Sequence, residues 1–287
     1  MEEMEKDFAR WLDPLQRGKL LHEVFHRFME ELRAKGERPS LKKHLDLMTD
    51  LAMKEIECCR EEVPPASELT FNREVEEIKQ TLQIFLRDEE ERCKNVEPSL
   101  FELSFGIPES QDDGVSTKGP IEIKLNDDEV FLLRGRIDRV DRSGEHEYEI
   151  LDYKTGSTWG YQEQGYLNHG KHLQHALYAM AAEILLRKHY DKKTRVVRSG
   201  YYFPTTKGHG LLVVRSNPVR EELSEVLRDL FELLRKGVFP PASDKDPCNF
   251  CDYGRICGGP GVAVKRFKEK LEKDSKLKPI NRLKDHV

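Results

Sequence analysis

The apolar residues in the first third of the chain recur at helical spacing. Leu21, Phe25 and Phe28, for example, fall on one face of a helix. Two consecutive prolines, Pro64 and Pro65, interrupt the pattern once. The first third is therefore predicted to be helical, over residues 7–35, 41–60 and 68–94.

The pattern changes near Ser99, where short runs typical of strands begin. Turn residues such as Asp127-Asp128 and Ser143-Gly144 separate these runs, and Pro218 is placed to open a helix. The order predicts an α/β layer with an N-terminal helical part. Strands are predicted over residues 100–105, 121–125, 130–140, 148–153, 195–203 and 210–215, and helices over about 171–189 and 218–236.

Composition limits the class of protein. The chain has 287 residues, of which 35% are charged and 37% are hydrophobic, as suits long solvated helices. No apolar run reaches the length of a membrane span, and the first ten residues lack the apolar core of a signal peptide. We therefore expect a cytoplasmic protein without a membrane partner. The net charge of −5 excludes a uniformly basic nucleic-acid coat, but it allows a local positive groove beside an acidic metal site.

The strongest chemical signal lies on two neighbouring strands. Asp138 ends the apolar run of one, and Asp152 does so on the next. A hairpin would bring the two carboxylates together, and they would need a hard cation such as Mg²⁺ or Mn²⁺. Lys154, two residues after Asp152, should face the same side, where its ammonium can serve a water and offset charge on a phosphate. Singly these are ordinary strand-end groups, but together they indicate a phosphodiester-hydrolysing site.

These strands resemble the RecB/AddB branch of the PD-(D/E)XK nuclease superfamily. Gly135-Arg136-Ile137-Asp138 and Ile150-Leu151-Asp152-Tyr153-Lys154-Thr155-Gly156 carry the likeness. Three further motifs match in order: Gly18 followed by His22, Glu102 followed by Phe105, and Gln174 followed by Tyr178. The resemblance covers about residues 15–260. It implies a restriction-endonuclease-like core, in which helices flank a central mixed sheet.

The resemblance also implies roles for single residues. His22, Asp138 and Asp152 would bind Mg²⁺ or Mn²⁺ with the Tyr153 carbonyl, and Lys154 would serve the attacking water. Glu102, Gln174 and Tyr178 would support the site or hold DNA. The implied activity is a deoxyribonuclease, more an exonuclease than an endonuclease, that processes single-stranded DNA in double-strand-break repair and recombination. A helicase would lie on missing sequence or on another chain.

A cysteine motif follows the predicted core. Cys248, Cys251 and Cys257 have the C-x2-C-x5-C spacing of zinc or iron–sulfur ligands. In AddB-type nucleases three such cysteines join one upstream of the histidine motif to hold a 4Fe–4S cluster, but no cysteine precedes His22. Three explanations stay open: the chain is a fragment, Cys58, Cys59 or Cys93 substitutes, or the cluster is lost. We divide the chain into a helical part (1–98), a nuclease core (99–240) and a cysteine-bearing basic tail (241–287).

Three alternatives compete with the nuclease interpretation. His22-Glu23-Val24-Phe25-His26 matches the H-E-x-x-H helix of zinc metalloproteases, with Glu55 as a candidate third ligand. The spacing of Gly165, Gly170 and Lys171 imitates a phosphate loop, but His172 stands where Ser or Thr would bind Mg²⁺. The third alternative is a catalytically silent DNA-binding scaffold. The presence of a suitable residue at every catalytic position argues against it.

Overall fold

The computed structural model divides the chain into two compact units. The first comprises Met1–Ile123, Phe131–Glu163 and Gln174–Asn217, and the second comprises Lys124–Val130, Gln164–Leu173 and Pro218–Val287. The helical part and the main sheet thus belong to one unit. The structure describes residues 10–108, 113–125, 129–161, 167–216, 220–241, 243, 248 and 251–286.

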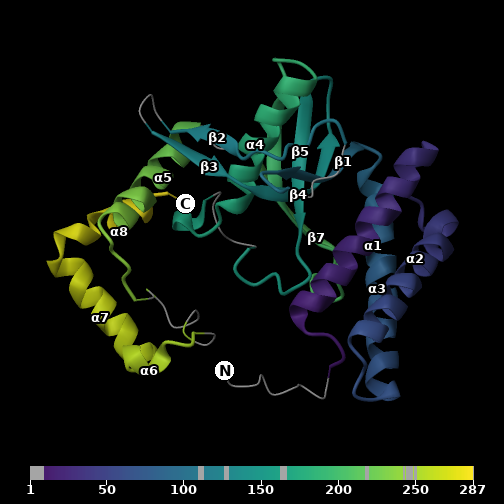
Figure 1. Ribbon diagram of the computed structural model, residues 1–287, viewed down its shortest axis with the longest axis horizontal. Helices are drawn as coiled ribbons and strands as arrows, with labels where there is room; N and C mark the ends of the chain where they lie inside the picture. The colour runs from purple at the N-terminus through teal and green to yellow at the C-terminus, as the bar shows by residue number, and fades with distance from the viewer. Residues whose placement is uncertain are drawn as a thin grey trace. The chain divides into compact units, whose positions relative to one another are not determined.

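Three antiparallel helices open the first unit: α1 (Pro14–Lys35), α2 (Leu41–Glu62) and α3 (Glu68–Arg92). They run side by side in Figure 1. Asp13 caps α1, because its side chain accepts the backbone N–H of Gln16 at 2.8 Å and the Gln16 side chain returns the bond. The three predicted helices are therefore confirmed, but α1 begins at Pro14 rather than at residue 7.

The central sheet has five strands in the order β1-β4-β5-β6-β7. Among the described strands of this sheet β5 and β6 are the one parallel pair, and α4 (Gln174–His189), between them in sequence, packs on both. This mixed sheet flanked by helices is the restriction-endonuclease-like α/β fold that the resemblance implied. The strands are β1 (Glu97–Phe105), β4 (Gly135–Arg142), β5 (Glu147–Tyr153), β6 (Arg195–Phe203) and β7 (Leu211–Ser216).

Two hydrophobic clusters stabilise the unit. Leu151 and Tyr153 of β5 join the apolar residues of α1, α2 and α3, where Phe25 stacks on Phe85 at 4.1 Å. Ile150, on the other face of β5, packs with the alanines and leucines of α4. The strand is thus buried on both faces, and its last residues are held at the junction of helix bundle and sheet.

The prediction of a single strand over residues 130–140 is wrong. The run 130–140 is two strands, β3 (Val130–Leu133) and β4, which separate at Arg134. β3 pairs with β2 (Ile121–Lys124) in a separate two-stranded sheet, while β4 joins the central sheet. At the start of β4, Gly135 leaves room for the Tyr178 ring, because a Cβ there would lie 2.9 Å from it.

The second unit is mainly helical. Arg282 of α8 donates to Asp229 of α5 at 2.7 Å and ties the two helices together. The predicted helix start at Pro218, the Asp127-Asp128 turn and Gly165 lie outside the described residues. Among the described helices, none combines the length and apolar character that a membrane crossing requires. The helices are η1 (Asn168–Gly170), α5 (Arg220–Arg235), α6 (Gly254–Cys257), α7 (Pro260–Lys273), η3 (Ser275–Leu277) and α8 (Lys278–Leu283).

Candidate metal and nuclease site

The site begins where β4 and β5 stop pairing. Their ladder runs from Arg142↔Tyr148 to Arg139↔Leu151. One residue beyond it, the Asp138 carboxylate takes the place of a ladder acceptor, and its Oδ2 receives the backbone N–H of Tyr153 at 2.6 Å. The carboxylate is thereby fixed at the fork between the strands.

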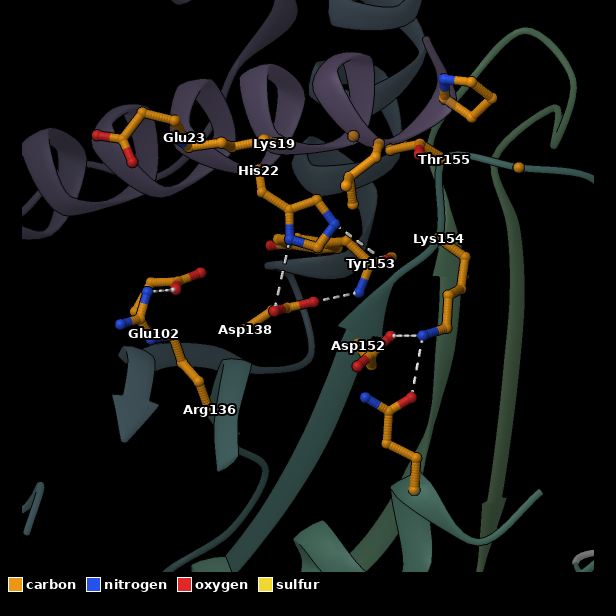
Figure 2. A pocket seen from close by; sticks show the side chains of 15 residues that line it. Lys19, His22, Glu23, Glu102, Arg136, Asp138, Asp152, Tyr153, Lys154 and Thr155 are labelled. Atoms are coloured by element: carbon orange, nitrogen blue, oxygen red, sulfur yellow. Dashed lines mark hydrogen bonds and ion pairs between the residues drawn. The ribbon is translucent and has the colours of Figure 1, made fainter. Parts of the chain in front are cut away.

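His22 reaches the same point from α1. Its Nε2 lies 3.1 Å from the Tyr153 carbonyl, which accepts the hydrogen bond, and its Nδ1 lies 3.5 Å from Asp138 Oδ1. One helical turn earlier, a Cβ at Gly18 would lie 3.3 Å from Thr155 Oγ1. Glycine at this position therefore lets α1 approach the end of β5 closely. Figure 2 shows the imidazole directed at Asp138 and Tyr153.

Glu102 completes a group of three candidate ligands. It lies between the paired positions Phe101↔Arg139 and Leu103↔Ile137, and its φ of 52° is left-handed. This conformation is strained for a glutamate and is typical of functional sites. One ligand atom each of His22, Glu102 and Asp138 lies within 4.8 Å of the others. The resemblance implies a supporting or DNA-holding role for Glu102, and the sequence signal for it is an acid that interrupts the apolar run of β1.

Asp152 and Lys154 form the other half of the site. Their side chains make an ion pair, and the Lys154 ammonium also donates to Gln174 Oε1 at 3.0 Å (Figure 2). The backbone N–H of Lys154 donates to the Tyr202 carbonyl at 2.8 Å, which fixes the residue just beyond β5. The two residues therefore share one side, as the spacing predicted.

Burial and the crowding of acids shift the pKa values of the ionisable groups in the site. Burial, and then the Asp138 charge, raise the pKa of Glu102 to about 7. The same two causes raise the pKa of Asp152 to about 6. Burial lowers the pKa of His22, but hydrogen bonding to Asp138 and the surrounding carboxylates outweigh it, so the net pKa is raised. The pocket thus carries an excess of buried negative charge.

The residues fit a divalent cation. Carboxylate oxygens suit hard cations such as Mg²⁺ or Mn²⁺, and a neighbouring imidazole is compatible with Mn²⁺. Glu102 pairs with Arg136 at 3.3 Å, and Asp152 pairs with Lys154. Burial and the Asp138 charge still raise the pKa of both acids, and a bound cation would offset that crowding of charge. The donors face a pocket of about 600 Å³, which Lys19 and Arg136 also line. No residue pattern in the sequence places Lys19 in this pocket, whereas Arg136 belongs to the strand motif that ends at Asp138.

Tyr178 and Tyr153 both have rings packed at the end of the sheet, and their predicted roles as a supporting residue and as a carbonyl ligand stay predictions. The Tyr178 ring packs edge-on against Phe105 at 5.8 Å. The Tyr153 ring is buried, and its carbonyl, the predicted extra ligand, accepts from His22. The Tyr178 ring thus packs with the hydrophobic cluster of α4, whereas the Tyr153 ring packs with that of α1, α2 and α3, and Tyr153 also lines the pocket.

The protease-like motif does not assemble a zinc site. Among the described residues, no group of three candidate ligands includes His26. Its Nε2 is 4.0 Å from Glu30, and burial lowers its pKa. Glu55, the candidate third ligand, pairs with Arg27 at 2.6 Å. His22 therefore belongs with Asp138 at the point where β4 and β5 separate, whereas His26 belongs to the packing of α1.

The cysteines likewise form no ligand group within the described part of the chain. Cys251 is exposed, and Cys248 and Cys257 are partly exposed. Cys93, one of the suggested substitutes, is 1% exposed, and burial raises its pKa to about 12. This thiol therefore lies in the core, where it contacts Glu89 and Arg139.

A mixed sheet whose forked strands present two acids and a lysine defines a nuclease of the restriction-endonuclease-like class. The family model described as the PD-(D/E)XK nuclease superfamily matches residues 4–258. The chain belongs to this superfamily, whose members are nucleases that use divalent metals. No curated protein matches the chain significantly.

Proposed function

We propose that this chain is a Mg²⁺- or Mn²⁺-dependent deoxyribonuclease. The observation that supports it most directly is the meeting of two groups in one pocket: the ligand group of His22, Glu102 and Asp138, and the Asp152–Lys154 pair. The first suits a hard cation and the second suits a phosphate. Superfamily membership supports the same activity.

Each residue has a defined task in this proposal. His22, Asp138 and either Glu102 or Asp152 hold the cation, and Tyr153 orients two of them through its backbone. When bound, a divalent cation supplies Lewis-acid polarisation of the phosphate and acidifies water. The Lys154 ammonium offsets negative charge on the phosphate, and Gln174 holds that ammonium in place.

The order of the motifs supports a finer assignment. We place the chain in the RecB/AddB branch, as an exonuclease on single-stranded DNA in double-strand-break repair and recombination. In this assignment a helicase partner opens the duplex and the protein works in the cytoplasm. The four motifs shared with that branch, in the same order, are the basis of this assignment.

Cleavage of labelled single-stranded DNA by wild type and by Lys154→Ala tests the activity. We expect Mg²⁺- or Mn²⁺-dependent cleavage by wild type and a loss of about 10²-fold or more in the variant, the range for a lost charge-stabilising group. Lys207→Ala, which removes an exposed lysine outside the pocket, is the matched control and should cleave normally. Binding without cleavage by wild type would instead support a silent scaffold, and cleavage of peptides would support the protease.

A further inference from the structure

A tight turn after the catalytic lysine displays an exposed tryptophan. The N–H of Tyr161 donates to the Thr158 carbonyl at 3.1 Å, and Gly160 has a φ of +85°. Trp159 therefore occupies the first corner of a turn that requires glycine at the second. Its side chain is 74% exposed, although large apolar side chains are normally buried.

The base of this turn is fixed to the sheet. The Tyr161 ring packs edge-on against Tyr201 at 4.9 Å and Phe203 at 5.1 Å, both on β6. Arg215 of β7 donates to the Tyr161 carbonyl at 3.2 Å. The backbone N–H of Trp159 also donates to Ser157 Oγ at 3.1 Å. The indole is thus presented on an anchored backbone.

The turn is coupled in space to the candidate site. Tyr201, against which Tyr161 packs, is also the ring over which the Lys154 ammonium lies, at 5.3 Å. Gly156 lines the pocket, and Trp159 follows three residues later. Because a residue spans at most ~3.6 Å, the two Cα atoms lie within about 11 Å of each other. A strand held in the pocket therefore has neighbouring nucleotides within reach of the indole.

We propose that Trp159 stacks on an unpaired base beside the cleaved phosphodiester and thereby selects single-stranded nucleic acid. The proposal rests on the nuclease function proposed above, and it assigns the residue that recognises the substrate. Lys19 and Arg136 supply positive charge in the same pocket for the phosphates. An exposed aromatic ring beside a phosphate site is the usual arrangement for binding single strands, because every base has a π-face. Inside a duplex the neighbouring base pairs cover that face.

Binding by Trp159→Ala and Trp159→Phe tests the stacking. The affinity for an oligothymidylate should fall about 5- to 150-fold in Trp159→Ala, the fold-change of ~1–3 kcal/mol per stacked base. Trp159→Phe should recover most of it. An abasic strand of equal length and charge should bind both variants and wild type alike. Leu69→Ala, which removes another exposed apolar side chain, is the matched control and should bind as wild type does.

Fluorescence gives a second readout. The chain has two tryptophans, Trp159 and the buried Trp11. In a Lys154→Ala background, which slows cleavage about 10²-fold or more, the oligonucleotide should quench the emission, and Trp159→Phe should abolish the quench. This measurement reports stacking whether or not the protein cleaves.

The outcomes separate the two proposals. Normal wild-type cleavage with unchanged affinity and quench in the Trp159 variants would overturn stacking and leave the nuclease intact. A wild type that cleaves nothing would overturn the nuclease, while the quench would still decide on stacking. If Trp159→Ala weakened the binding of a blunt duplex as much as that of a single strand, the proposed selection of unpaired bases would be wrong.

Discussion

Tyr153 connects the candidate site to the hydrophobic core. Its backbone N–H and carbonyl bind Asp138 and His22, while its ring lies 5.5 Å from Phe25 and 6.0 Å from Phe85. Two ligands are therefore positioned by peptide groups that cannot move without disturbing packed aromatic rings. Such support is what a site needs to hold ligands in a productive geometry.

His26 should make the protein sensitive to mild acid. Burial lowers its pKa below the ordinary value of 6.5, and Arg136 and Arg27 add to this, although Glu30 and Glu23 oppose it. The unfolded chain then binds the proton first, so stability falls as the pH drops through about 6.5. We expect His26→Gln to lose less stability than wild type between pH 7.5 and about 5.5.

Urea unfolding across this range measures the effect. His22 titrates in both proteins, so the difference between the two curves isolates His26. Parallel curves for wild type and His26→Gln would show that His26 is not buried in its neutral form.

At the scale of elements, a buried charge network ties α3 to the sheet. Arg139 of β4, fully buried, contacts Glu89 of α3 at 2.6 Å and Asp141 at 2.7 Å. Arg92 of α3 binds the other oxygen of Asp141 at 2.5 Å. Asp138 and Arg139 are consecutive, so the network also holds the strand segment that carries the candidate ligand.

Arg139→Ala should be strongly destabilising. Removing the guanidinium leaves the buried Glu89 carboxylate without its ion-pair partner and leaves Asp141 with Arg92 alone, which costs about 3–5 kcal/mol. Arg142→Ala, on the same strand but with an exposed pair to Glu97, is the matched control and should change stability little. Chemical denaturation measures both. Equal effects for the two arginines would mean that the network does not stabilise this strand.

Features set by residues close together in the chain can be predicted from the sequence, and features set by contacts between distant segments cannot. Asp138, Asp152 and Lys154 were predictable because strand spacing sets their side, and the helices were predictable from their period. The break at Arg134 was not, because the pairing of β3 with β2 and of β4 with β1 and β5 is a choice of strand partners that the apolar run 130–140 does not encode. The place of Glu102 depends on a left-handed φ that no periodicity encodes.

At the scale of the whole molecule, the cysteine motif is a prediction that the fold leaves open. If the resemblance to AddB-type nucleases extends to Cys248, Cys251 and Cys257, the protein purified without oxygen should hold iron and sulfide in equal amounts. Cys251→Ser should then lose both, and Cys58→Ser should lose both only if Cys58 supplies the fourth ligand. Iron and sulfide analysis measures this, and wild-type protein free of iron would contradict the cluster.

The most direct test of the account is a Mn²⁺ titration of wild type and Asp138→Asn, followed by cleavage of single-stranded DNA by the same samples. Asp138 joins the ligand group, whereas Glu23 lines the same pocket outside it, so Glu23→Gln is the matched control. We expect Asp138→Asn to weaken Mn²⁺ binding by at least ~10–100-fold, the effect of losing even an outer partner of a metal, and to abolish cleavage. Glu23→Gln should retain both properties. Wild-type affinity and cleavage in Asp138→Asn would contradict the account.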